Sequence, residues 1–223
     1  MNVIIFGATG MVGQGVLREC LADPQVERVL AVGRTPLEAG APKLRQLRVE
    51  SFLDYAGVEP DLAGYDACFF CLGVSSMGMA EAAYRRITYD FTLAAAQALV
   101  RLNPGMSFLY VSGMGTGGRS MWARVKGETE DALLALPFKA AYMLRPGFIQ
   151  PLHGIRSRTR IYRLAYALTG ALVPLLKRLM PGLMLTTEEL GRAMIHLARD
   201  GYPRPRLEIA DLRKAARTAA PPD

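Results

Sequence analysis

The stretch that decides the fold is Val3-Ile-Ile-Phe-Gly7-Ala-Thr-Gly10-Met-Val-Gly13-Gln-Gly15, close to the start of the chain. Its apolar run predicts a strand, and the residues from Val16 onward predict a helix. So short a turn needs backbone conformations that a Cβ atom would obstruct, and it directs the free N–H groups of the helix toward one place. The spacing Gly-x-x-Gly-x-x-Gly is a variant of the dinucleotide fingerprint. We therefore expect this turn to bind a pyrophosphate, with a tight turn that holds no ligand as the alternative.

The chain has 223 residues, 51% of them hydrophobic, which is typical of one α/β domain. The first apolar run is too short for a secretory signal and no charged segment precedes it, so we expect a cytoplasmic protein. Two of the three cysteines, Cys68 and Cys71, lie in an apolar, strand-like run. Residues three apart on a strand point to opposite faces, which favours reduced thiols over a disulfide or a metal site.

The net charge of +7 is spread unevenly along the chain. Residues 1–110 carry nine basic and eleven acidic residues, whereas residues 111–223 carry eighteen and nine. Between Asp131 and Glu188 there is no acidic residue at all. This acid-free region should attract phosphates, an anionic substrate or an anionic surface.

Apolar runs and helical periodicity alternate through most of the chain. They predict strands over 3–6, 29–32, 47–52, 67–72, 107–111 and 141–144, and helices over 80–102, over 123–135 and from Thr187, with Thr186 or Thr187 as its N-cap. This alternation predicts an α/β fold, a doubly wound parallel sheet of the Rossmann type with helices on both faces. We expect a single domain over residues 1–223, with about 148–190 forming a lid on the substrate side and a fraying tail from Arg213.

The second predicted strand ends in Gly33-Arg34, and this position separates the two nicotinamide dinucleotides. An acidic residue here would bind the ribose 2′-hydroxyl of NAD, whereas a guanidinium binds a 2′-phosphate. Arg34 therefore predicts NADP rather than NAD, unless it is only a solvated turn residue. We also expect Asp54 to accept a hydrogen bond from the adenine amine, and the backbone of 71–73 to pass beneath the adenosine ribose.

Several short motifs occur together in a characteristic order. They are Gly7-Ala-Thr-Gly10-Met-Val-Gly13, Val32-Gly-Arg34, Cys71-Leu-Gly73, Val111-Ser-Gly113, Val125-Lys126-Gly-Glu-Thr-Glu130 and Leu144-Arg-Pro-Gly147. In this order they resemble the atypical short-chain dehydrogenase/reductases, near the NmrA-like proteins and the Tat-interacting oxidoreductases. The resemblance covers about residues 1–200.

The resemblance implies a catalytic Tyr-x-x-x-Lys pair that works with a serine, in which the lysine holds the nicotinamide ribose and the tyrosine transfers a proton. The lysine is Lys126, but four residues before it stands Trp122, whose indole is a donor only. Related proteins often have two serines where this chain has Ser112-Gly113, so Ser112 stands either at the position of the catalytic serine or next to it. The catalytic residues implied are thus Lys126 and Ser112, with no metal.

The cofactor-binding residues predicted from the turn, the strand ends and the resemblance are Gly7, Thr9, Gly10, Met11, Val12, Gly13, Arg34, Asp54, Cys71, Leu72, Gly73, Ser112, Lys126, Pro146 and Gly147. Other groups could replace the missing phenol. Tyr84, Tyr89 and Tyr110 have the right chemistry but the spacing of packing residues. His153 follows the segment that the resemblance places around the nicotinamide, although a single histidine is more often structural.

Two functions fit these residues, and both include NADP(H) binding. One is an oxidoreductase of unknown substrate, and the other is a non-catalytic, NADP(H)-sensing regulatory protein, so the partner is a small molecule or a protein and we expect no nucleic acid. The basic segment 156–182 also carries an apolar stripe, Ile161, Leu164, Ala165, Leu168 and Leu172. Such a stripe suits a lid or a helix lying on anionic lipid, but it is too short to cross a bilayer.

Overall fold

The first apolar run forms strand β1 (Asn2–Phe6), and the glycine turn leads directly into helix α1 (Met11–Ala22), as the sequence predicts. The computed structural model describes residues 1–38, 40–155 and 184–218. The other elements of the described chain are β2 (Arg28–Gly33), β3 (Leu44–Arg48), α2 (Glu59–Leu62), β4 (Ala67–Phe70), α3 (Glu81–Arg85), η1 (Arg86–Asp90), α4 (Phe91–Leu102), β5 (Ser107–Val111), α5 (Met121–Leu134), β6 (Ala140–Arg145), β7 (Phe148–Gln150), β8 (Met184–Thr186), α8 (Thr187–Asp200), β9 (Arg206–Glu208) and α9 (Ile209–Thr218).

Strands β3, β2, β1, β4, β5, β6 and β9 form one sheet in that order, within the part of the chain that the structure describes. Every neighbouring pair in it is parallel, so the carboxyl ends of the strands all lie at one edge. The chain order reverses between β1 and β4, and the crevice at such a switch point is where open α/β sheets bind ligands. The predicted Rossmann-type sheet is confirmed.

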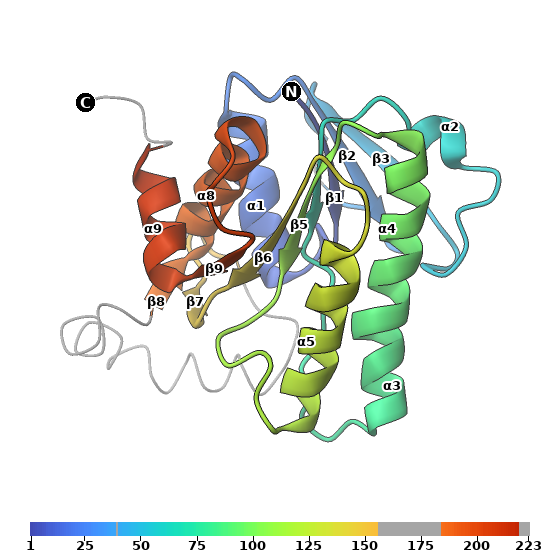
Figure 1. Ribbon diagram of the computed structural model, residues 1–223. Coiled ribbons are helices and arrows are strands. Elements are labelled where there is room, and N and C mark those ends of the chain that lie inside the picture. The colour runs from blue at the N-terminus through green and yellow to red at the C-terminus, as the bar shows by residue number, and fades with distance from the viewer. Residues whose placement is uncertain (39, 156–183, 219–223) are drawn as a thin grey trace.

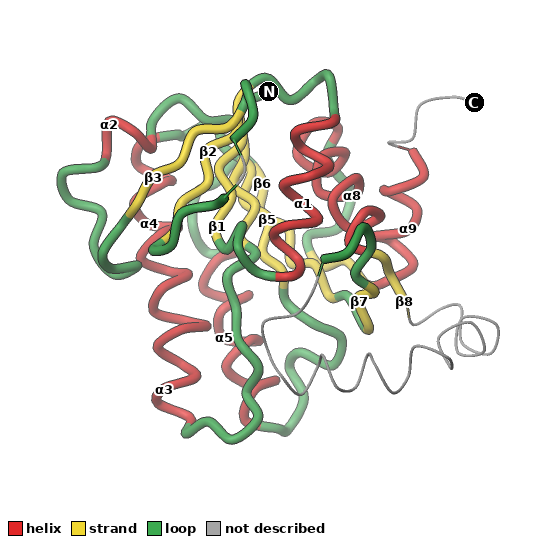
Figure 2. Tube along the Cα trace, turned by 180° about the vertical axis from the view of Figure 1, so that it is seen from behind, coloured by secondary structure: helices red, strands yellow, loops and turns green. Residues whose placement is uncertain are grey.

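Helices cover both faces of the sheet. Helices α1, α8 and α9 lie on one face, and α3, α4 and α5 lie on the other (Figures 1 and 2). Because strand side chains alternate, Val3 and Ile5 pack into the core beneath α1 and α8, whereas Ile4 and Phe6 pack into the core beneath α4. Burial on both faces explains why β1 and β4 read as continuous apolar runs.

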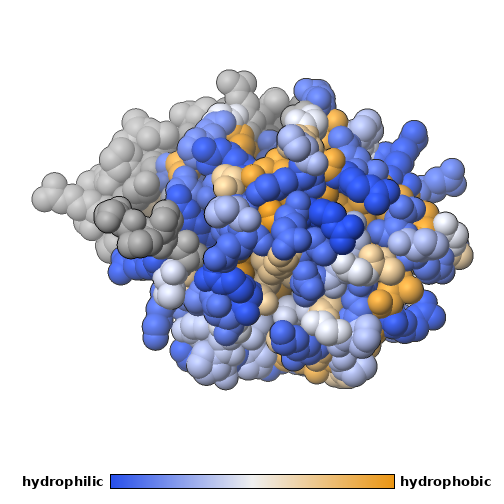
Figure 3. All heavy atoms as spheres, turned by 90° about the horizontal axis from the view of Figure 1, so that it is seen from above, coloured by the Kyte–Doolittle hydropathy of each residue, from blue (hydrophilic) through white to orange (hydrophobic). Residues whose placement is uncertain are grey.

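The two ends of the sheet differ in what they carry. Figure 1 shows β7, β8 and the beginnings of α3 and α5 gathered at the end where the strands finish. Figure 3 looks onto the opposite end, where hydrophilic residues cover most of the surface and apolar residues lie in separate patches. The functional residues predicted from strand ends therefore belong to the first of these two ends.

Two elements depart from the sequence prediction. The third strand spans Leu44–Arg48 rather than residues 47–52, because it lies at the sheet edge with mostly exposed side chains and so has little apolar pattern. The helix predicted over 80–102 contains a π-helical turn, η1, between α3 and α4. A π-turn adds one residue, a shift that three- and four-residue spacing does not reveal.

The carboxyl-terminal part contains one confirmed and one wrong prediction. Thr186 caps α8 as expected: its Oγ1 accepts from the Glu189 backbone N–H at 3.0 Å while the Glu189 carboxylate accepts from the Thr186 N–H. The fraying tail predicted from Arg213 is wrong, because α9 continues to Thr218 and buries Ala215 against the core. From Arg213 onward its buried residues are the small Ala215 and Ala216, which lie among basic residues and give little apolar pattern in the sequence.

The predicted lid region is described only at its two ends, where β7 pairs with β8 in parallel. The basic, apolar segment 156–182 lies outside the described residues. Among the helices that are described, none is long and apolar enough to cross a membrane.

Candidate functional site

The glycine turn has little space for side chains. Gly7 has a φ of +79°, and a Cβ there would lie 2.7 Å from the Leu72 backbone nitrogen. A Cβ on Gly13 would lie 2.1 Å from the Gly7 carbonyl oxygen, closer than atoms can approach. The Gly10 N–H donates to that same oxygen at 2.9 Å and closes the turn. Glycine is therefore required at residues 7 and 13 for the strand and the helix to meet so closely.

The start of α1 is free to bind an anion. Its N-cap residue, Gly10, offers no side chain to the first N–H groups, and the first turn carries no acidic residue. Thr9 links the turn to the helix, because its carbonyl accepts a hydrogen bond from Gln14 Nε2 at 3.0 Å. Met11 and Val12 follow in the first turn of the helix. This arrangement of unpaired donors, dipole and small residues fits a pyrophosphate.

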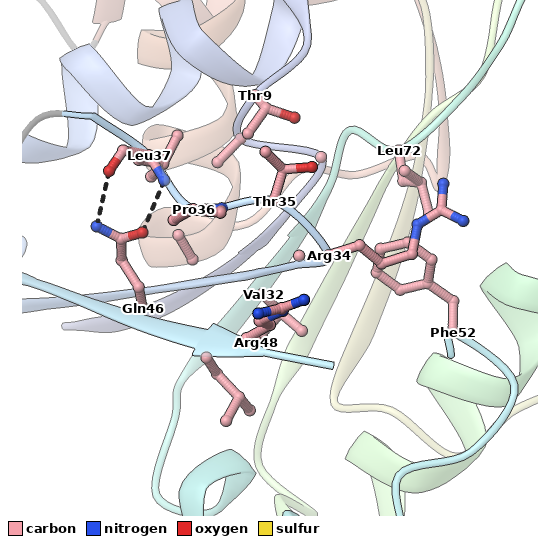
Figure 4. Close-up of a pocket in the computed structure, with 15 residues that line it drawn as sticks. Thr9, Val32, Arg34, Thr35, Pro36, Leu37, Gln46, Arg48, Phe52 and Leu72 are labelled. Carbon is pink, nitrogen blue, oxygen red and sulfur yellow. Dashed lines mark hydrogen bonds between the residues drawn. The ribbon is translucent and has the colours of Figure 1, made fainter. Parts of the chain in front are cut away.

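A cavity of about 180 Å³ lies next to this turn, at the carboxyl ends of β2 and β3 (Figure 4). Its lining residues are Gly7, Ala8, Thr9, Ala31, Val32, Gly33, Arg34, Thr35, Pro36, Leu37, Gln46, Leu47, Arg48, Phe52 and Leu72. Its walls come from the first three strands and from the loop after β4, which is where an adenosine would lie above a Rossmann sheet.

Two arginines lie in this cavity. The Arg34 guanidinium carbon lies 5.4 Å from the centre of the Phe52 ring, so the ring supports its flat face. Arg48 is paired with Gly33, the residue before Arg34, in the register of β2 and β3. The amide of Gln46 both donates to and accepts from the Leu37 backbone, which holds the loop that follows Arg34. The sequence analysis did not predict Arg48 and Phe52. Their positions depend on how the edge strand β3 pairs with β2, and the sequence pattern of β3 does not reveal that pairing.

Of the other residues predicted at the adenosine end, Leu72 lies at the cavity and Asp54 does not. Leu72 lines the cavity, and the backbone of Cys71 and Leu72 lies against Gly7. Gly73 follows with open space around it. Cys71 is a free thiol like the other two cysteines, and burial raises its pKa to about 12. Asp54, however, is exposed outside the cavity, where its carboxylate accepts from the Ala56 N–H at 2.9 Å.

The second part of the site lies at the end of β5. Lys126, on α5, donates from Nζ to the carbonyls of Val111 at 3.2 Å and Ser112 at 3.1 Å. Its ammonium lies 5.1 Å from the centre of the Tyr110 ring. Burial lowers the pKa of Lys126 to about 8, against an opposing effect of the Glu130 carboxylate. The structure thus anchors the predicted lysine at the strand end where the nicotinamide ribose is expected.

Ser112 lies within a buried network centred on Glu130. The Ser112 hydroxyl donates to Glu130 Oε1 at 2.6 Å and lies 3.0 Å from the Thr116 hydroxyl. Glu130 is fully buried and is also paired with Arg145, at 2.6 Å and 3.0 Å, and with Arg206 at 3.2 Å. The serine hydroxyl is therefore used to satisfy a buried carboxylate. Glu130 belongs to a motif of the sequence, but the partners of its side chain could not be predicted from that motif.

Trp122 begins the same helix and packs against the loop after β5. A Cβ on Gly115 would lie 3.6 Å from the six-membered ring of Trp122, and one on Gly113 would lie 4.0 Å from it. The ring therefore covers this glycine-rich loop, at the helical position where the resemblance places a phenol. Gly113 stands where related proteins often carry the second serine.

The alternative proton donors lie in other surroundings. Tyr84 and Tyr110 are buried, and burial raises the pKa of both phenols. Tyr89 lies under the guanidinium of Arg85, 4.5 Å from ring centre to carbon. His153, with a φ of 55°, places its Nε2 3.2 Å from a Glu188 carboxylate oxygen.

The segment after β6 is tied to the loop after β5. The Pro146 carbonyl accepts from the Met114 N–H at 2.9 Å, and Gly147 follows before β7. The structure therefore brings Pro146 to the same sheet edge as Ser112 and Lys126. Of the predicted site residues, only Asp54 is placed away from the rest of its expected group.

The parallel sheet and the glycine turn define a Rossmann-type α/β protein, and the position of Lys126 at the end of β5 agrees with the resemblance to the atypical short-chain dehydrogenase/reductases. No family model matches the chain. It is 26% identical over 219 residues to "Protein FMP52-2, mitochondrial" of Scheffersomyces stipitis, covering 93% of this chain and 91% of that protein. It is 28% identical over 152 residues to "Protein HTATIP2" of Rattus norvegicus, covering 66% and 62%.

Solved structures agree with this fold. An oxidoreductase of the short-chain dehydrogenase/reductase family from Burkholderia thailandensis superposes with a TM-score of 0.69 at 16% identity, covering 96% of this chain and 92% of that one. MoeE5 in complex with UDP-glucuronic acid and NAD superposes with a TM-score of 0.70 at 19% identity, covering 94% and 76%. At these identities the likeness shows a shared fold.

The predicted cytoplasmic location is contradicted by the relatives. Fungal relatives from Scheffersomyces stipitis, Emericella nidulans and Saccharomyces cerevisiae are named mitochondrial. The prediction depended on the lack of a secretory signal, which argues against secretion but does not distinguish between compartments inside a cell.

Proposed function

We propose that this protein binds NADP(H) and acts as an oxidoreductase on a small molecule. The observation that carries the proposal is the continuous arrangement at the strand ends: the glycine turn, the cavity with Arg34 and Arg48, and the anchored Lys126. Each part fits a successive portion of one extended dinucleotide. The NAD complex of MoeE5, which has the same fold, supports a dinucleotide at this edge.

The two arginines support NADP over NAD. A 2′-phosphate carries two negative charges at neutral pH, and guanidinium groups bind such oxygens by paired, charge-assisted hydrogen bonds. Arg34 leaves the end of β2 and Arg48 leaves the end of the neighbouring β3, so they can contact the phosphate from two sides. Phe52 holds the Arg34 side chain flat, and adenine can stack on a guanidinium held in that way.

At the other end, the residues of this chain can hold and orient the nicotinamide ribose. Lys126 keeps donors near the end of β5, and the Pro146 segment adds a rigid wall because it is hydrogen-bonded to Met114. When bound, a reduced nicotinamide supplies a hydride. The role of the protein is then to fix the distance and angle between this ring and an acceptor and to exclude water.

A non-catalytic, NADP(H)-sensing protein with a protein partner is the second candidate. Trp122 in place of a phenol and the engagement of Ser112 with Glu130 favour it, because both remove proton-transfer groups from the site. Both candidates share the cofactor and differ in whether hydride leaves it.

Fluorescence titration with NADPH and NADH tests the shared part. We expect NADPH to bind at least about tenfold more tightly, a difference of about 1.4 kcal/mol that one charge-assisted bidentate contact can provide. Equal affinities would contradict the NADP preference, and no binding of either would contradict the proposed function.

A further inference from the structure

At the described strand ends, neither the serine position nor the phenol position that the resemblance assigns to proton transfer holds a free hydroxyl. The Ser112 hydroxyl is committed to the buried Glu130 carboxylate, and Trp122 stands at the phenol position. Tyr84 and Tyr110 are buried within the core. The reduction of an aldehyde or ketone produces an alkoxide, a strong base that needs a proton from a nearby acid as hydride arrives. These residues therefore do not support carbonyl chemistry of the usual kind.

Large apolar side chains of the same loops are exposed to solvent. Val74 and Met77, after β4, and Met114, after β5, are among the most exposed large apolar side chains of the described chain, at 44%, 66% and 47%. Beside Met114, the Trp122 ring covers the loop at Gly113 and Gly115, where the missing side chains leave the aromatic surface uninterrupted.

Ion pairs bring these loops together. Arg124, in the first turn of α5, binds the Glu81 carboxylate at 3.0 Å, and Glu81 begins α3. A second pair joins Arg85 to Glu128 one turn further along both helices. The loop that contains Val74 and Met77 leads into α3, so it ends beside the first turn of α5, which carries Trp122.

From this combination we propose that the substrate is a flat, apolar two-electron acceptor of the quinone class; this inference rests on the proposed NADP(H) oxidoreductase function. The reaction balances without an acid from the protein. One hydride, carrying two electrons, passes from NADPH to the quinone, which becomes a hydroquinone anion while NADPH becomes NADP⁺. The anion takes its proton from water.

The chemistry of quinones explains why the proton donor is dispensable. Hydride addition turns the quinone ring aromatic and spreads the negative charge over it, so the product anion is a much weaker base than an alkoxide. The Lys126 ammonium at the end of β5 can stabilise that charge electrostatically without losing its proton. Trp122, Met77 and Met114 provide apolar and aromatic contact for the ring faces.

Two acceptors with the same ring skeleton test the proposal: 1,4-naphthoquinone and the ketone 1-tetralone, each followed by NADPH oxidation above the rate without protein. We expect turnover of the quinone and a rate with the ketone lower by at least about a hundredfold, within the range that general acid catalysis supplies. The double variant Gly113→Ser/Trp122→Tyr adds a hydroxyl and a phenol. It should raise the ketone rate by about tenfold or more, so that the ratio of the ketone rate to the quinone rate rises.

Contact residues give a second measurement. Met77→Ser and Trp122→Ala should raise the KM for naphthoquinone about two- to tenfold, the range for lost aromatic and thioether contacts. Because Met77 is exposed, Met77→Ser tests the contact without disturbing the core. Arg101→Ser, on the far end of α4, is the control and should leave KM unchanged.

Three outcomes would overturn the proposal. Binding of NADPH without naphthoquinone turnover would reject the substrate class while leaving the cofactor proposal intact, and would favour the sensing protein. Ketone turnover comparable to that of the quinone would do the same, and more directly if Ser112→Ala or His153→Gln abolished it. Failure of the proposed function itself would appear separately, as a lack of NADPH binding.

Discussion

The two ends of the candidate site differ in completeness. At the adenosine end, the glycine turn, the cavity and both arginines supply the groups that the proposed NADP(H) binding requires. At the other end Lys126 and Ser112 are present, but the Ser112 hydroxyl is bound to Glu130, and Trp122 stands where the resemblance places the phenol. Binding and proton transfer are therefore separable in this fold, because they depend on different strand ends.

The largest expected effect concerns the buried network at the second end. Glu130→Gln would leave Arg145 and Arg206 facing a neutral amide, and breaking a buried ion pair destabilises by about 3–5 kcal/mol. Urea unfolding measures the loss. Glu128→Gln is the matched control: its carboxylate is half-exposed and paired with Arg85, so it should cost less than about 1 kcal/mol. Similar losses for the two variants would show that Glu130 has no special structural role.

A smaller effect is expected in the glycine turn. Gly13→Ala would gain about 1 kcal/mol of helix propensity, but its Cβ would overlap the Gly7 carbonyl oxygen, so we expect a net destabilisation of about 1–3 kcal/mol and weaker NADPH binding. Gly127→Ala, in α5, gains the same propensity with its nearest contact at 3.4 Å, and should change the free energy of unfolding by less than about 1 kcal/mol. A stable Gly13→Ala protein would mean that the turn is looser than described.

Arg34→Asp tests the adenosine end alone. The carboxylate would repel a 2′-phosphate and accept from a 2′-hydroxyl, so the preference for NADPH should fall by at least about tenfold and reverse toward NADH. Isothermal titration calorimetry with both dinucleotides measures it. Arg45→Asp, on the same strand as Arg48 but outside the cavity lining, makes the same charge change and should keep the NADPH preference. A preference unchanged in Arg34→Asp would assign the phosphate to Arg48.

The smallest effect is a pH dependence from Lys126. Its pKa is lowered to about 8 in the folded protein from 10.5, so between these values the unfolded chain binds more protons and the contribution of this group to stability rises with pH. Below about pH 8 both states are protonated and the contribution is constant. Lys126→Met should remove this rise, seen as a difference between the wild-type and variant unfolding free energies from pH 8 to 10. Parallel pH curves would contradict the buried position of the ammonium.

Local features of the chain could be predicted, and long-range ones could not. The glycine turn, Arg34 and the cap at Thr186 were predictable because each depends on residues within a few positions of one another. Arg48 and Phe52 depend on the register of an edge strand whose exposed side chains carry little pattern. Asp54 was misplaced for the same reason, since the strand was predicted to end later than it does.

The class of sheet, the glycine turn and the presence of Trp122 where the resemblance places a phenol could be read from the sequence, because periodicity and residue chemistry are local properties. The folded structure alone shows that Ser112 serves the Glu130 carboxylate, since the partners of that carboxylate lie 15, 18 and 76 residues away. It also decided that β9 and α9 complete the sheet and its cover, where Leu207 and Leu212 are buried. Short apolar segments of this kind are stabilised by packing against surfaces that other parts of the chain form. Their secondary structure therefore cannot be predicted from their own residue pattern.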